Sequence, residues 1–128
     1  MEEEENKNNK MNKFRFLEWN VYKDSKQLFS LIVKIINKIP REYRFELGSQ
    51  IIRSSLSIIL NIAEGSGKTS DKELNRFIEI SLGSASETLA TADVLRDNKL
   101  IKNEEFEEIY KKLNSISSQL GGFKKKLL

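Results

Sequence analysis

Apolar residues recur at steps of three and four positions through four long stretches of this 128-residue sequence, and its single proline is Pro40. This spacing puts apolar side chains on one face of an α-helix, and the scarcity of helix-breaking residues allows the helices to be long. The stripes predict helices over residues 20–38, from between 41 and 47 to about 64, 71–98 and 103–127. Four long helices joined by short connections predict an all-α, antiparallel up-down-up-down four-helix bundle.

The bundle is expected to form one domain over residues 14–128. Residues 1–13 are polar and charged, with almost no apolar side chains to offset the entropy lost on ordering them. They are therefore predicted to be a disordered tail.

Three short signals mark the expected ends of these helices. Pro40 ends the first helix, because the residue before a proline is pushed out of helical geometry. Gly65 is predicted to take the left-handed conformation that often follows a helix. Ser70 followed by Glu73 is a capping-box pattern that starts the third helix.

The sequence contains no histidine and no cysteine. The commonest general base, the usual zinc ligands, disulfides and thiolate chemistry are therefore excluded. No apolar stretch reaches the roughly 18–20 residues that a membrane-spanning helix needs, and the acidic, Asn-rich N-terminus is unlike a secretory signal. We therefore expect a cytoplasmic, non-enzymatic protein without a cofactor or a metal.

The second predicted helix is apolar on nearly all of its sides. One apolar row consists of Leu47, Ile51, Ile58 and Ile62. Other apolar residues lie elsewhere around the helix: Ile52, Leu56, Ile59 and Leu60. In a monomeric four-helix bundle one side of each helix faces water, so this pattern predicts a contact between copies.

A row of polar residues also runs along this second helix, at steps of three or four positions that keep them on one side. The third helix offers partners, and the predicted network comprises Gln50, Arg53, Ser57, Asn61, Glu64, Ser84 and Glu87. The favoured interpretation is an interhelical hydrogen-bond network that fixes the register of the helices. A subunit interface is an alternative, and so is a ligand or catalytic pocket that uses Glu64, Glu79 or Glu87.

Basic residues supply the candidate nucleic-acid contacts, although the formal net charge is only +3. These candidates are Arg41, Arg44, Arg53, Lys68, Lys72, Arg76, Lys124, Lys125 and Lys126. In a monomer such residues are most simply a solvated face, whereas cyclic symmetry would combine small patches into one larger positive surface. The turn over residues 65–70 superficially resembles a phosphate-binding loop, but it lacks the required spacing and joins two helices. Aromatic platforms for single strands are not evident, because Trp19 and most phenylalanines are expected in the core or at the bundle ends.

Two blocks of the second helix, SQIIRSSLSI over 49–58 and NIAEG over 61–65, resemble the central signature of the 23S rRNA-intervening sequence proteins. FIEIS over 77–81 and GSASET over 83–88 are similar to that family's third helix, and the similarity spans about 14–127. Two departures are Ile52 before Arg53, where the family usually has paired arginines, and the missing proline before Asn61.

The resemblance implies four-helix bundles that assemble into a ring, typically a homopentamer, with no enzymatic activity. The family's members are encoded within intervening sequences of bacterial 23S rRNA genes or stand alone. The related accessory variability proteins of diversity-generating retroelements are basic rings that bind nucleic acid and a reverse transcriptase.

These inferences lead to two main functional hypotheses. The first is a non-enzymatic, homo-oligomeric protein that associates with RNA or DNA, or with a nucleic-acid-handling protein such as a reverse transcriptase. The alternative is a scaffold or adaptor for a protein partner with no direct nucleic-acid contact. A hydrolase that uses Arg53, Asn61, Glu64 and Glu87 is a third and less favoured hypothesis.

Overall fold

The computed structural model describes residues 13–127, and four long helices form most of it. These are α2 (Asn20–Ile36), α4 (Ser49–Ser66), α5 (Asp71–Asp97) and α6 (Asn103–Leu127). The 3-10 helix η1 (Arg15–Glu18) precedes them, and the short α3 (Arg41–Tyr43) and the π-helical η2 (Arg44–Gly48) lead straight into α4. The predicted all-α, four-helix architecture is confirmed. Apart from Lys13, the predicted tail over residues 1–13 lies outside the described residues.

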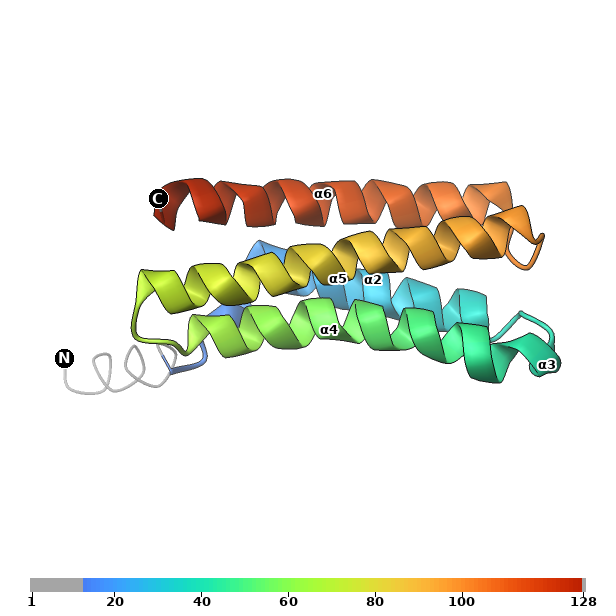
Figure 1. Cartoon of the computed structure of the whole chain (residues 1–128), viewed down its shortest axis with the longest axis horizontal. Helices are drawn as coiled ribbons and strands as arrows, with labels where there is room; N and C mark the ends of the chain where they lie inside the picture. Colours follow the sequence, from blue (N-terminus) through green and yellow to red (C-terminus); the bar gives the residue numbers. More distant parts are fainter. Residues whose placement is uncertain (1–12, 128) are drawn as a thin grey trace.

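Consecutive long helices run in opposite directions and form a bundle (Figure 1). Helix α2 packs against α4 and α6, and α5 also packs against α4 and α6, with the closest packing between α4 and α5. The α4–α5 turn and the last turn of α6 lie at one end of the bundle, which we call the terminal end (Figure 1). The connections from α2 to α3 and from α5 to α6 lie at the opposite end.

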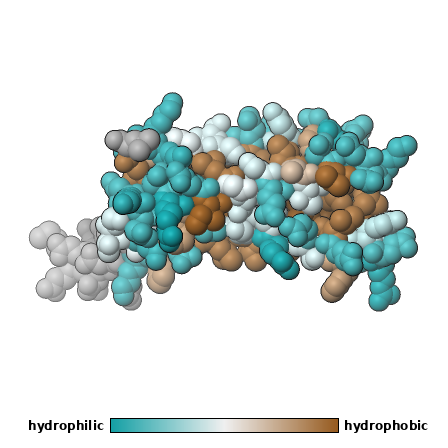
Figure 2. Space-filling view, in the orientation of Figure 1, coloured by the Kyte–Doolittle hydropathy of each residue, from teal (hydrophilic) through white to brown (hydrophobic). Residues whose placement is uncertain are grey.

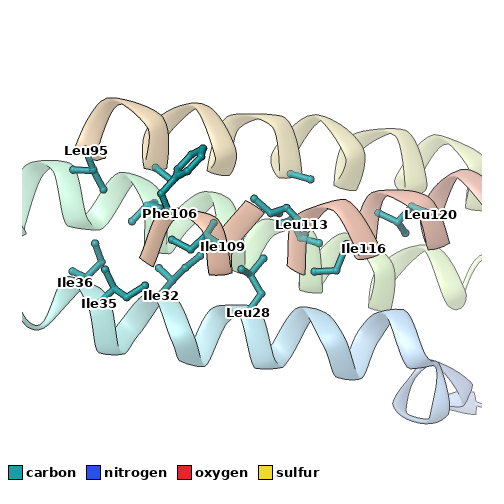
Figure 3. Packing of buried hydrophobic residues seen from close by; sticks show 14 of the residues in the cluster. Leu28, Ile32, Ile35, Ile36, Leu95, Phe106, Ile109, Leu113, Ile116 and Leu120 are labelled. Carbon is teal, nitrogen blue, oxygen red and sulfur yellow. The ribbon is translucent and has the colours of Figure 1, made fainter. Parts of the chain in front are cut away.

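Apolar side chains from all four helices fill the centre of the bundle. Leu28 and Ile32 of α2 and Ile109 and Ile116 of α6 are completely buried and face one another across the core (Figure 3). Each fully buried side chain of this kind contributes about 1.5–3 kcal/mol through removal of apolar surface from water. The periodic apolar stripes of the sequence therefore form the main source of stability.

The ends of α5 show one predicted and one unpredicted capping arrangement. The Ser70 hydroxyl oxygen accepts a hydrogen bond from the Glu73 N–H at 3.2 Å, as the sequence predicted. At the other end, Lys99 has a left-handed backbone with φ 60°. The Lys99 N–H donates to the Arg96 carbonyl and the Leu100 N–H to the Leu95 carbonyl, both at 2.9 Å. This is the Schellman arrangement, which usually places glycine at the position that Lys99 occupies.

The prediction of a left-handed Gly65 is wrong. Helix α4 continues to Ser66, and no glycine among the described residues has a positive φ. A Cβ atom on Gly65 would lie 2.8 Å from Phe77 Cβ and 3.2 Å from Leu74 Cδ1. Gly65 is therefore needed because α5 approaches α4 too closely there for any side chain.

The second predicted helix begins at Arg41, but its first part is not a regular α-helix. Residues Arg44–Gly48 form a π-helical segment, in which the turns are wider than in an α-helix. The Arg44 guanidinium donates to the carbonyl oxygens of Asn37 and Ile39, at 3.0 and 3.1 Å, at the end of α2. A Cβ atom on Gly48 would lie 2.7 Å from Ile36 Cγ2, so the segment packs tightly on α2.

No helix among the described residues is both long enough and apolar enough to cross a membrane.

Candidate interaction surfaces

The closest contact in the bundle is the seam between α4 and α5, and the predicted polar row runs along it. The Gln50 side-chain amide donates to the Glu87 carboxylate at 2.7 Å. The Ser57 and Ser84 hydroxyl oxygens are 2.9 Å apart. The Asn61 amide donates within α4, to the carbonyl of Ser57 at 2.8 Å. The outer edge of the seam is thus closed by polar contacts.

Deeper in the same seam lies a set of buried hydroxyls that the sequence analysis did not include. Thr88 Oγ1 lies 2.8 Å from both Ser54 Oγ and the Ser84 carbonyl oxygen. The Ser81 hydroxyl donates to the Ile58 carbonyl oxygen at 3.0 Å. The recurrence of Ser81, Ser84 and Thr88 at steps of three and four positions was the signal that could have identified them.

Arg53 and Glu64 differ from the rest of the predicted row. Both are exposed, and neither side chain makes a hydrogen bond or an ion pair with another residue of the described part of the chain. Both side chains are therefore free for contacts outside this subunit.

Most of the predicted basic residues gather at the terminal end of the bundle. They come from the α4–α5 turn, the start of α5 and the last turn of α6: Lys68, Lys72, Arg76, Lys124, Lys125 and Lys126. Lys68 Nζ and Arg76 Cζ lie 5.2 and 5.1 Å from the centre of the Phe77 ring. An aromatic face at this distance attracts the cation and restrains its side chain.

Two of these cations also face carboxylates. Lys124 Nζ lies 3.1 Å from Glu79 Oε1, which links α6 to α5, and Arg76 lies 3.9 Å from Glu73. Lys72, Lys125 and Lys126 are exposed and form no ion pair within residues 13–127. The terminal end therefore carries three lysines without an ion pair, together with the exposed carboxylates of Glu64 and Asp71.

The remaining predicted basic residues lie elsewhere. Arg41 and Arg44 lie at the opposite end, and Arg53 lies on the exposed side of α4. Because Arg44 already donates to two carbonyl groups, its role is to hold the end of α2.

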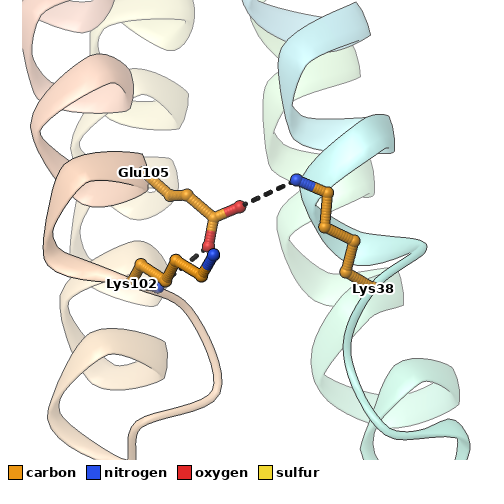
Figure 4. Close-up of polar contacts among 3 residues, drawn as sticks. All are labelled: Lys38, Lys102 and Glu105. Atoms are coloured by element: carbon orange, nitrogen blue, oxygen red, sulfur yellow. Dashed lines mark hydrogen bonds and ion pairs between the residues drawn. The ribbon is translucent and has the colours of Figure 1, made fainter.

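A carboxylate organises the opposite end of the bundle. Glu105 accepts a hydrogen bond from the Lys102 backbone N–H at 2.9 Å, which caps the start of α6. Its second oxygen lies 3.4 Å from Lys38 Nζ, so the same side chain ties α6 to the end of α2 (Figure 4). Within residues 13–127 no group of three or more carboxylates is placed to hold a metal ion.

Comparison with known proteins identifies the family and the fold of the chain. Residues 17–122 match the family described as 23S rRNA-intervening sequence protein. The chain belongs to this family. The resemblance inferred from the helix motifs is therefore confirmed.

A solved structure gives the same result for the fold of this 23S rRNA-intervening sequence protein. It is a protein of unknown function from the S23 ribosomal protein family of Bacteroides thetaiotaomicron VPI-5482. The two chains are 26% identical, with a TM-score of 0.76 over 82% of this chain and 98% of the other. No curated protein matches the chain.

The signature residues of this 23S rRNA-intervening sequence protein have structural roles in the seam. Gly65 of the block NIAEG lies where α5 closely approaches α4. Asn61 of the same block donates to the hydroxyl of Ser57, which in turn contacts Ser84 of α5. Ser84 and Glu87, from the block GSASET, bond to α4 from the other side. The motifs that identify the family therefore encode the packing of two helices.

The outer surface of this 23S rRNA-intervening sequence protein exposes several large apolar side chains. Leu56 and Leu60 of α4 and Ile80 and Val94 of α5 are each between 38% and 54% exposed. Figure 2 shows apolar side chains reaching the surface between polar ones on the face formed by α4 and α5. Phe45, in the π-helical segment, is 84% exposed. Single exposed apolar side chains are common, but several on two neighbouring helices make this face a candidate contact surface.

Proposed function

We propose that this chain is a non-enzymatic, homo-oligomeric protein that binds nucleic acid through the terminal end of its bundle. The observation that carries the proposal is the gathering of basic side chains from α5 and α6 at that end. Antiparallel packing puts the start of α5, which carries Lys72, at the same end of the bundle as the last turn of α6, which carries Lys126 (Figure 1). Each phosphate that a lysine or arginine neutralises releases a counterion, so affinity grows with the number of such contacts.

The cations at the terminal end are better arranged for phosphate binding than isolated surface cations would be. The Phe77 ring restrains Lys68 and Arg76, which lowers the entropy lost when these side chains bind a ligand. Lys72, Lys125 and Lys126 form no ion pair among the described residues, so their charges are available to the phosphate groups of a nucleic acid.

Self-association supports the same function. The exposed apolar side chains on α4 and α5, among them Leu60 and Ile80, would be removed from water by a second copy. Copies related by cyclic symmetry present identical terminal ends, so the basic surface increases with each subunit.

The proposal is tested by measuring the binding of a fluorescent structured RNA and a DNA duplex at two salt concentrations. The test variant replaces Lys124, Lys125 and Lys126 with glutamine. A charge-matched control replaces Lys34, Lys99 and Lys102, which are exposed and lie away from the terminal end. We expect micromolar binding that weakens with salt, a smaller salt slope for the test variant and an unchanged slope for the control.

Absence of salt-sensitive binding at micromolar protein would overturn the nucleic-acid function. The exposed apolar face on α4 and α5 favours a second candidate, a scaffold for a protein partner. That function predicts that substitution of Leu60 with serine removes the partner, while the triple lysine variant keeps it.

A further inference from the structure

Phe45 is the most exposed large apolar side chain in the described part of the chain, at 84%. Its backbone is nevertheless held firmly. The neighbouring Arg44 is bonded to the carbonyls of Asn37 and Ile39, and Gly48 packs against Ile36. The ring therefore projects from a fixed segment, which is the form of an interface anchor that loses little entropy on binding.

A groove between α5 and α6 offers a matching receptor. Its cavity has a volume of about 470 Å³, and its apolar lining is Leu89, Ala90, Phe106 and Tyr110. Ala90 and Tyr110 are exposed, whereas the Phe106 ring forms the buried part of the lining. An apolar cavity of this size is large enough for an aromatic side chain, since ligand pockets begin at roughly 300 Å³.

Charges beside the ring and beside the groove are complementary. Arg41 is exposed and belongs to the same short helical connection as Phe45, four residues before it. Asp93 and Glu107 lie at the rim of the groove. Asp93 pairs with Arg96, but Glu107 is exposed and forms no ion pair with any residue from 13 to 127.

We infer that Phe45 of one copy inserts into the α5–α6 groove of a second copy, with Arg41 facing Glu107. Because Phe45 is 84% exposed in its own chain, it does not fill the groove of that chain, so a Phe45 ring in the groove would belong to another molecule. The inference rests on the self-association in the proposed function and names the surfaces that produce it. The contact joins two different surfaces, so it is head-to-tail. Each added copy leaves one Phe45 side chain and one groove free until the subunits close into a circle.

The first test compares two phenylalanines by sedimentation velocity of the full chain. Phe45→Ala removes the anchor, and Phe14→Ala is the matched control, because Phe14 is 57% exposed but lies before η1. Loss of a central aromatic anchor weakens an interface by about 30-fold or more. We expect the Phe45 variant to dissociate at protein concentrations where the wild type and the control stay assembled. An unchanged mass for Phe45→Ala overturns the inference.

The second test mixes two defective variants. Phe45→Ala keeps an intact groove, and Ala90→Arg blocks the groove but keeps the ring. Each alone should be monomeric, whereas their mixture should form a one-to-one complex with twice the mass of one chain. Ser30→Arg on α2 is the control for the added arginine and should assemble like the wild type. A mixture that stays monomeric, or that forms larger assemblies, overturns the head-to-tail contact.

A charge exchange tests the pairing of Arg41 with Glu107. Arg41→Glu and Glu107→Arg should each weaken assembly, and the double variant should restore it. A double variant weaker than either single variant contradicts the pairing. A wild type that is monomeric overturns self-association as well, whereas the RNA and DNA measurements report separately on the terminal end.

Discussion

The two long seams on opposite sides of the bundle are built from different kinds of side chain. The seam between α4 and α5 is lined by small and hydroxyl-bearing residues, among them Ser54, Gly65 and Thr88. The seam between α2 and α6 is filled by large aliphatic residues such as Ile32 and Ile109 (Figure 3). One bundle therefore combines close helix approach with bulk apolar burial.

The difference shows how stability and specificity are divided in this fold. Apolar burial depends on area and not on direction, so the α2–α6 seam stabilises the bundle without strictly defining its register. Buried hydroxyls each require a partner in one position, so the α4–α5 seam admits one alignment of the two helices. Residues of the motifs that identify the family lie in the α4–α5 seam.

The largest effect should come from a cavity in the α2–α6 seam. Ile109→Ala removes a completely buried side chain and should lower the free energy of unfolding by about 3–4 kcal/mol. Ile80→Ala, at a side chain that is 42% exposed, is the control and should cost about 1 kcal/mol or less. Urea denaturation measures both, and equal losses would mean that the seam is not the main source of stability.

Two glycines test the close approach in the α4–α5 seam. Gly65→Ala should lower the free energy of unfolding by about 1–3 kcal/mol, because the new Cβ would collide with Phe77. Gly83→Ala on α5 places its Cβ in open space and should raise stability by up to about 1 kcal/mol through helix propensity. Thermal unfolding of the two variants should therefore shift in opposite directions; shifts of the same sign would contradict the packing argument.

Hydroxyl contacts in that seam should have the next largest effect. Thr88→Val keeps the shape of the side chain but leaves the buried Ser54 hydroxyl without this contact, and should cost about 1–2 kcal/mol. Thr91→Val is the control, since the Thr91 hydroxyl bonds only to a carbonyl one turn earlier in its own helix. Chemical denaturation should separate the two variants. If both behave alike, the seam hydroxyls contribute no specificity.

A polar contact between α2 and α6 should matter least. The Gln119 amide donates to the Asp24 carboxylate at 2.8 Å, near the edge of the seam. Gln119→Ala should change the free energy of unfolding by only roughly 0.5 kcal/mol, because water replaces a partly exposed hydrogen bond at little cost. A loss as large as that of Thr88→Val would remove the distinction between the two seams.

The sequence predicted the four long helices well, because each depends on apolar periodicity within a single helix. It predicted the Ser70 cap for a similar reason, since that signal is local. Gly65 was misread because its role depends on the approach of Phe77 from another helix. Lys99 gave no signal, because a left-handed position held by lysine lacks the usual glycine.

The interaction surfaces were less predictable than the fold. The antiparallel order of the helices was sufficient to bring the lysines of α6 near the start of α5. No prediction was made for Phe45, and the π-helical segment that contains it changes the angle between successive side chains. A regular 3.6-residue period cannot anticipate that change, so the exposure of the ring became evident only from the structure.

The placement of α2 between α4 and α6 has a consequence for biosynthesis. The ribosome synthesises α2, α4 and α5 before residues 103–127 exist. During that interval Leu28 and Ile32 lack the partners that bury them in the finished bundle. The nascent chain therefore lacks the α6 partner of this aliphatic surface until residues 103–127 have left the ribosome, and chaperones that hold such surfaces would act on it during this interval.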